Sequence, residues 1–299
     1  MGCWAMGGLW WGEDVRDGDC ISAVHAALDH GINWFDTAPL YGHGHADQVL
    51  VRALGSRKHD VLIATKVGVR WDGDGQHARS ELTRDWIRQD VDASLQRLGL
   101  DRIDLLQVHW PCELETPLEE SMTALADLQK AGKVRHVGLS NYDAADIEKC
   151  RQFLPIVSLQ SPYSLLRREL EREEIPYCAQ NAIAVLAYEP LCRGLLTGKY
   201  KANSKFPESD LRARDERFQG PRFLRALTIV SRLELLAKRH HVPVAALALG
   251  WVLRQPGLTS VIAGAKTAAQ VHEHARVLDV LEDEAIWPEV DRIVAAYRG

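Results

Sequence analysis

Short, mostly apolar segments alternate with longer amphipathic segments along the chain. The apolar runs lie at residues 32–36, 61–66, 103–109, 134–140, 158–160, 184–188 and 259–262. Apolar runs of this length are typical of parallel strands buried on both faces, which need crossover helices to connect them. With a first strand expected inside residues 1–12 and ending near Trp4, the pattern predicts a (β/α)8 TIM barrel.

The amphipathic segments carry helix start and stop signals. We expect helices at 17–30, 46–54, 83–99, 116–132, 226–240 and 244–255, and one that begins at Ala268. Thr116 with Glu119, and Thr267 with Gln270, stand at the spacing of a capping box, and Pro117 suits the first helical position.

Two stretches between these elements are rich in glycine and charged residues. Residues 67–80 are expected to form a loop, and residues 189–225 a long loop after the seventh strand. We therefore predict a single domain over residues 1–299, with a long loop after strand 7 and two additional helices before the last strand.

Polar side chains end most of the predicted strands. They are Asp36, Lys66, His109, Ser140 with Asn141, Gln160 and Tyr188, and Tyr41 follows shortly after Asp36. Every strand of a (β/α)8 barrel delivers its C-terminal residue to one common face, so these groups should share a pocket. A lysine ending a buried strand loses hydration unless it is paired, and Asp36 on the neighbouring strand is its expected partner.

This set of side chains suits the reduction of a carbonyl group. A free tyrosine has a pKa of about 10, and a nearby lysine cation lowers it by favouring the phenolate. Tyr41 would then donate the proton, Asp36 would hold Lys66, and His109 would orient the carbonyl. No side chain supplies a hydride, so a nicotinamide cofactor is required. Ser140, Asn141 and Gln160 could hold its carboxamide, with a cap for the following helix as the alternative role of Ser140 and Asn141, and Tyr188 could stack on its ring.

A metallohydrolase is the alternative that His43-Gly44-His45 raises, because two histidines after a strand can bind zinc. Lys66 at the next strand end is a poor neighbour for a cation, so we expect no metal. The net charge of −5 argues against nucleic acid or an anionic membrane as a partner. The chain shows no spanning segment and no signal peptide. Its six scattered cysteines are expected to be reduced thiols of a cytoplasmic protein.

Six motifs resemble those of the aldo-keto reductases over nearly the whole chain. They are D-T-A-P-L-Y-G-H-G (36–44), A-T-K (64–66), Q-V-H-W-P (107–111), G-L-S-N-Y (138–142), Y-E-P-L-C-R-G-L-L-T-G-K (188–199) and V-I-A-G-A-K-T-A-A-Q (261–270). The 192–199 stretch and the D-L-R-A-R-D-E-R-F loop look most like the bacterial branch of general-stress and inositol-cluster reductases.

The resemblance implies an NADP-dependent reductase of aldehydes or ketones that uses NADPH, with Asp36, Tyr41, Lys66 and His109 as the catalytic residues. It implies that Leu191, Arg193, Gly194, Leu196 and Gly198 line the pyrophosphate, and that Gly264, Lys266, Thr267, Gln270, Glu273 and His274 bind the adenosine 2′-phosphate end. Trp4 and Trp110 fall where the family lines its substrate pocket. Sugars, aromatic aldehydes and dicarbonyls are equally compatible substrates, and no oligomeric state is implied.

Three features depart from the family pattern: the start of the chain and two residues. The chain begins at the first predicted strand, without the usual N-terminal hairpin. His274 stands where an asparagine commonly contacts adenine, and Glu189 stands where a small residue is common, so that an extra carboxylate is expected to disfavour acidic substrates. A nucleotide-sensing regulatory subunit with little turnover, like the potassium-channel β subunits of this family, is the alternative function.

Overall fold

One parallel sheet forms the centre of the molecule. The computed structural model describes residues 1–11, 15–72, 77–112 and 116–297. The strands are β1 (Trp34–Asp36), β2 (Leu62–Val67), β5 (Ile103–Val108), β6 (Val134–Ser140), β7 (Ile156–Pro162), β8 (Ala184–Tyr188) and β9 (Leu258–Ile262). They follow one another around the sheet in chain order, each parallel to its neighbours.

The first residues of the chain, centred on Gly2, close this sheet into a barrel. Gly2 bridges Asp36 on β1 and Gly264 just after β9, both in parallel. The amide of Gly2 donates to the carbonyl of Ala263 at 3.0 Å, and the amide of Cys3 donates to the carbonyl of Asp36 at 2.8 Å. The expected (β/α)8 TIM barrel is therefore confirmed.

The expected end of the first strand at Trp4 is wrong. Trp4 begins a short 3-10 helix, η1 (Trp4–Gly7), because the backbone turns at Cys3, where ψ is 1°. The ring of Trp4 is carried by this helix toward the C-terminal face of the barrel, where it lines a cavity.

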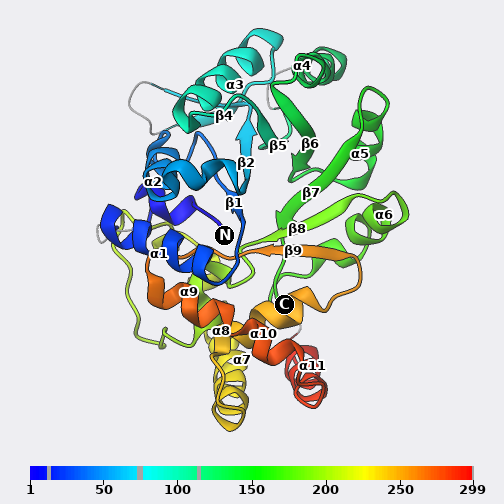
Figure 1. Ribbon diagram of the computed structural model, residues 1–299. Coiled ribbons are helices and arrows are strands. Elements are labelled where there is room, and N and C mark those ends of the chain that lie inside the picture. The colour runs from blue at the N-terminus through cyan, green and yellow to red at the C-terminus, as the bar shows by residue number, and fades with distance from the viewer. Residues whose placement is uncertain (12–14, 73–76, 113–115, 298–299) are drawn as a thin grey trace.

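Helices surround the barrel (Figure 1). They are α1 (Asp17–Asp29), α2 (His45–Leu54), α3 (Arg84–Leu98), α4 (Leu118–Lys130), α5 (Ala144–Arg151), α6 (Glu174–Gln180), α7 (Gly220–Arg239), α8 (Val244–Leu253), α9 (Ala268–Ala275), α10 (Val277–Leu281) and α11 (Trp287–Ala295). The chain between β8 and α7 holds three 3-10 turns, η4 (Cys192–Thr197), η5 (Leu211–Ala213) and η6 (Glu216–Phe218). No described helix is long and apolar enough to cross a membrane.

Of the two capping predictions, the one at Thr267 holds and the one at Thr116 does not. The Thr83 hydroxyl accepts from the amide of Trp86 at the start of α3, and that of Thr267 accepts from the amide of Gln270 at the start of α9. Thr116 was expected to cap α4, but Pro117 occupies the N-cap position and no side chain caps that helix. The helix begins one residue later than the motif predicts.

Two loop predictions need correction. Within residues 67–80, β3 (Val69–Trp71) and β4 (Ala78–Ser80) form an antiparallel hairpin. The stack of the Trp71 ring on the His43 ring, at 4.9 Å between centroids, holds this hairpin beside the site. The long loop after β8 ends at residue 219, because Pro221 sits in the first turn of α7 and extends that helix toward the N-terminus.

The loop that carries Tyr41 packs against η1 through two glycines. Gly42 has a φ of +61°, and a Cβ atom built there would lie 2.2 Å from the carbonyl oxygen of Gly7. A Cβ atom on Gly7 would lie 2.6 Å from the amide of Gly42. Only glycine allows this approach, which fixes Tyr41 relative to Trp4.

We expect Gly42→Ala to destabilise the protein by about 1–3 kcal/mol, because the added methyl group must push η1 away from the Tyr41 loop. Thermal unfolding measures the effect. Gly18→Ala in α1 is the matched control, since nothing lies within 4 Å of its Cβ position and alanine favours a helix. An unchanged melting temperature for Gly42→Ala would contradict the close packing.

Candidate active site

A cavity of about 590 Å³ opens at the C-terminal ends of the strands. Asp36, His109, Ser140, Asn141, Gln160 and Tyr188, which lie at or near the C-terminal ends of five different strands, all line it. Tyr41, Trp4, Trp110, Leu191, Arg193, Gly194, Gly264, Lys266, Gln270, Glu273 and His274 line it as well. The structure therefore brings most of the predicted site residues together around one space.

Four predicted residues do not line the cavity. Lys66 lies behind Tyr41 and Asp36 and is 1 % exposed. Leu196 is part of the hydrophobic core, and the hydroxyl of Thr267 caps α9. Gly198 has a φ of +81° and packs against the Glu234 side chain. These last three residues shape the backbone around the cavity and do not face it.

Lys66 joins the acid and the tyrosine in one buried group. Its Nζ atom donates to Asp36 Oδ1 at 2.6 Å, to the Tyr41 hydroxyl at 2.9 Å and to the carbonyl oxygen of Thr37 at 3.1 Å. The expected pairing of Asp36 with Lys66 is confirmed. The three donors of the ammonium group are thereby used.

The second oxygen of Asp36 is held by two glutamines, one of which sequence reasoning missed. Gln107 Nε2 donates to Asp36 Oδ2 at 3.1 Å, and Gln160 Nε2 donates to the same atom at 2.8 Å. Gln107 lies two residues before His109 in the Q-V-H-W-P motif. Side-chain alternation along a strand, which places residues 107 and 109 on one face, was the signal that could have found it.

Burial decides the protonation of the central groups. It raises the pKa of Tyr41 above its ordinary value, and Lys66 only opposes this rise, so the expected net lowering is wrong. Burial by itself lowers the pKa of Lys66, but Asp36 and Tyr41 more than offset it and the net shift is upward. The pKa of His109 is well below its ordinary value, through burial and then Lys66. Near neutral pH the tyrosine is protonated, the lysine is charged and the histidine is neutral.

The tips of β6 and β8 are tied to each other by Asn141. This residue has a φ of +64°, which asparagine tolerates better than most residues. Its Nδ2 atom donates to the carbonyl of His109 at 3.1 Å and to Ser140 Oγ at 3.0 Å. Its Oδ1 atom accepts from the Tyr188 hydroxyl at 2.8 Å, which fixes the ring of Tyr188.

Aromatic side chains form the wall nearest to Tyr41. The rings of Trp4 and Tyr41 are stacked with centroids 6.2 Å apart, and Trp11 meets Trp4 edge-on at 5.0 Å. The His109 ring lies 4.9 Å from that of Trp110. Trp10 and Trp11 also line the cavity, which is therefore apolar around the Tyr41 hydroxyl.

Basic side chains gather at the other end, near α9. Lys266 was predicted there, but Lys199 and Arg212, which also line the cavity, were missed. Asp210 pairs with Arg212, whereas neither lysine forms an ion pair with a carboxylate in the described parts of the chain. Burial, followed by Arg212 and Lys266, lowers the pKa of Lys199. An arrangement of this kind favours an anionic ligand.

Other side chains of α9 complete this end. The Gln270 Oε1 atom accepts from the backbone amide of Lys266 at 2.7 Å, so Gln270 acts as a helix cap. His274 lines the cavity, and burial lowers its pKa to about 4, with Lys199 contributing. His274 is therefore neutral at physiological pH and offers a ligand one donor and one acceptor.

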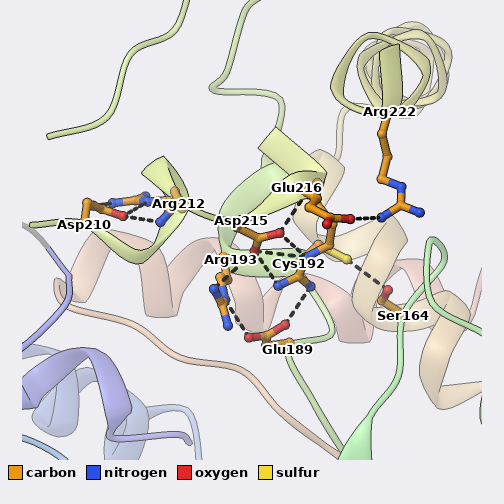
Figure 2. A network of polar contacts seen from close by, with 10 residues as sticks. Ser164, Glu189, Cys192, Arg193, Asp210, Arg212, Asp215, Glu216 and Arg222 are labelled. Carbon is orange, nitrogen blue, oxygen red and sulfur yellow. Dashed lines mark hydrogen bonds and ion pairs between the residues drawn. The ribbon is translucent and has the colours of Figure 1, made fainter. Parts of the chain in front are cut away.

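A closed network of charges fixes the loop after β8 (Figure 2). Glu189 accepts from Arg193 Nε and from Arg217 Nη1, both at 2.7 Å. Asp215 pairs with the same two arginines, at 3.1 Å and 2.6 Å. The charges of the two acids and the two arginines cancel. The guanidinium of Arg193 also lies 5.4 Å from the centroid of the Trp4 ring.

Glu189 was expected to disfavour acidic substrates through its negative charge, but the two arginine partners neutralise that charge. Its carboxylate lines the cavity but carries two arginine partners, and these hold its pKa below the ordinary value although burial alone would raise it. Glu189, Cys192 and Arg193 all have a positive φ, of 51°, 47° and 54°. The charge network holds this strained backbone in place.

Comparisons with known proteins agree with this architecture. The model of the Aldo/keto reductase family matches residues 1–295. The chain belongs to the aldo-keto reductase family. The aldo-keto reductase YhdN of Bacillus subtilis is 39 % identical over 274 residues, covering 91 % of this chain and 82 % of that protein. The NADH-specific methylglyoxal reductase of Escherichia coli is 34 % identical over 292 residues, covering 94 % and 89 %.

A solved structure of another protein shares the fold of this chain. The glycerol dehydrogenase of Gluconobacter oxydans is 37 % identical, with a TM-score of 0.89, covering 99 % of this chain and 90 % of that one. The expected similarity to the bacterial branch of the family is confirmed. The chain is thus an aldo-keto reductase by fold and by family.

We expect Arg217→Met to destabilise the loop after β8, because Glu189 and Asp215 would then share one arginine. The loss of a largely buried partner is on the order of 2 kcal/mol. Limited proteolysis should cut residues 198–219 faster, and thermal unfolding should shift downward. Arg222→Met is the control, since its pair with Glu216 is mostly exposed and such pairs contribute little. Equal behaviour of the two variants would contradict a structural role for the network.

Proposed function

We propose that this protein reduces an aldehyde or ketone to an alcohol with NADPH, and that Tyr41 donates the proton. The observation that supports this most directly is the 2.9 Å contact between Lys66 Nζ and the Tyr41 hydroxyl, with Asp36 2.6 Å from the same nitrogen. Family membership supports the reaction class.

The chain itself would handle the proton and the orientation of the substrate. A bound nicotinamide would supply the hydride for the carbonyl carbon. The Tyr41 hydroxyl would pass its proton to the carbonyl oxygen, and the phenolate left behind would be stabilised by the Lys66 cation. Neutral His109, whose ring centroid is 6.0 Å from that of Tyr41, would donate a hydrogen bond to the same oxygen.

The cavity suits a nicotinamide dinucleotide phosphate in its charge distribution. Ser140, Asn141 and Gln160 provide hydrogen-bonding groups at the strand ends, where Tyr188 offers a fixed ring for stacking. Lys199 and Lys266 are cations without carboxylate partners in the described residues, and they line the end near α9. Arg193 is already paired, so these lysines are the better candidates for the phosphates.

The wall of Trp4, Trp11 and Trp110 favours a neutral substrate that presents an apolar face to the tryptophan rings. Such faces occur on aromatic aldehydes and on sugars, and small dicarbonyls would also fit. Arg193 and Arg212, which line the cavity, are paired with Glu189 and Asp210, and this disfavours substrates that need a free arginine.

We expect Tyr41→Phe to lower kcat for aldehyde reduction by at least about 100-fold, because general acid catalysis normally contributes 10²–10⁴-fold. Binding of NADPH, followed by fluorescence titration, should stay nearly unchanged. If the variant keeps more than roughly a tenth of the wild-type turnover, Tyr41 is not the proton donor.

We expect Lys266→Ala to weaken NADPH binding by about tenfold and NADH binding much less, since a charge-assisted contact to a phosphate is lost only with NADPH. Lys205→Ala is the control, because Lys205 is an exposed lysine that does not line the cavity. Equal losses for both nucleotides would contradict a 2′-phosphate contact, and a wild-type preference for NADH would reverse the proposed cofactor.

Turnover by the wild-type protein also separates the enzyme from the nucleotide-sensing alternative. A panel of aromatic, sugar and dicarbonyl aldehydes should give multiple turnovers of NADPH. Tight nucleotide binding without turnover on any member of the panel would favour the regulatory role.

A further inference from the structure

Gln107 is a buried polar residue that the steps above do not use. It lies on β5, has no exposed surface and does not line the cavity. Its Nε2 atom donates to Asp36 Oδ2, and its Oε1 atom accepts from Gln160 Nε2 at 3.0 Å. Gln160, on β7, does line the cavity.

A glycine lets these two side chains meet across the strand between them. Gly138 on β6 pairs with Gln107 in the sheet. A Cβ atom on Gly138 would lie 3.3 Å from Cγ of Gln107 and 2.2 Å from Oγ of Ser158. With no side chain on β6 at this level, the amides of β5 and β7 can reach each other and Asp36.

Hydrogen-bonding capacity then determines which way the Gln160 amide points. An ionised carboxylate only accepts hydrogen bonds, and Lys66 already occupies Oδ1 of Asp36. Both glutamines must therefore turn their NH2 groups toward Oδ2. The second hydrogen of Gln160 Nε2 goes to Gln107 Oε1, so the atom that Gln160 retains for a ligand is its carbonyl oxygen.

We propose that Gln107 is a positioning residue that fixes the Gln160 amide with its carbonyl oxygen available to the cofactor, so that the site selects a carboxamide NH2 group. The inference rests on the proposed use of a nicotinamide cofactor. It also joins cofactor recognition to the Lys66–Asp36 pair, because one chain of hydrogen bonds runs from Lys66 through Asp36 to both glutamines.

The test compares two oxidised cofactors that differ only at the carboxamide. NADP+ has an NH2 donor there, whereas 3-acetylpyridine adenine dinucleotide phosphate has a methyl group. Wild-type protein should bind NADP+ about tenfold more tightly, because the analogue leaves the Gln160 oxygen unpaired. In Gln107→Leu the amide of Gln160 keeps its bond to Asp36 Oδ2 but loses its second acceptor, Gln107 Oε1, so it is held less firmly and the preference should fall below about threefold.

Ser158→Ala is the matched control. Ser158 Oγ is buried in the same part of the barrel and has no hydrogen-bond partner within the described residues, so its removal should keep the wild-type preference. A double variant, Gln107→Leu with Gln160→Leu, should show no larger loss of preference than Gln160→Leu alone, because Gln107 acts through Gln160.

A second variant keeps the volume of the side chain in case Gln107→Leu does not fold. In Gln107→Glu the introduced carboxyl can donate to Asp36 only while it is protonated. Its kcat for aldehyde reduction should therefore fall as pH rises through the pKa of that carboxyl, in a range where the wild-type rate is flat.

The outcomes separate this inference from the proposed function. Wild-type protein that binds neither NADP+ nor NAD+ would overturn the proposed function and the inference with it. Wild-type binding and turnover, together with an unchanged cofactor preference in a folded Gln107→Leu and a flat pH profile in Gln107→Glu, would overturn the positioning role alone.

Discussion

The buried ion pair of Lys66 and Asp36 is the constraint on which the site depends. Removing two charges from water costs several kcal/mol per ion, and the structure offsets this cost with hydrogen bonds to both oxygens of the carboxylate and from all three donors of the ammonium group. Lys66 uses its donors on Asp36, Thr37 and Tyr41, and Asp36 receives two amides in addition. The ion pair therefore requires polar groups from several strands, and the barrel is the arrangement that brings those strands to one face.

The sequence was most informative where the physics is local and repetitive. Buried parallel strands produce apolar runs, and the polar residues that end them are visible because they interrupt the run. Asp36, Lys66, His109 and Gln160 were found in this way, and the structure gathers them. The Thr267 cap was found because a helix cap depends only on a few neighbouring residues.

Sequence reasoning failed where distant segments decide the outcome. The pKa of Tyr41 depends on how much protein covers it, and no local motif reports that burial. Lys199 and Arg212 lie in an irregular loop, and only the fold brings them to Lys266. The hairpin β3–β4 is stabilised by the contact between the Trp71 and His43 rings. The glycine- and aspartate-rich sequence of this segment suggested a loop and gave no sign of that contact. The roles of the individual cofactor contacts remain predictions for the same reason.

The positive φ angles of Glu189, Cys192 and Arg193 have a consequence for how the site can evolve. β-Branched and bulky residues fit poorly in this backbone region, so many replacements at these positions would strain the loop. The ordinary helical backbone of α9 accepts many side chains, and its residues Gln270, Glu273 and His274 face the same cavity. If the cavity binds the nucleotide as proposed, its preference for one nucleotide can change most easily through substitutions in α9, while the segment after β8 stays fixed.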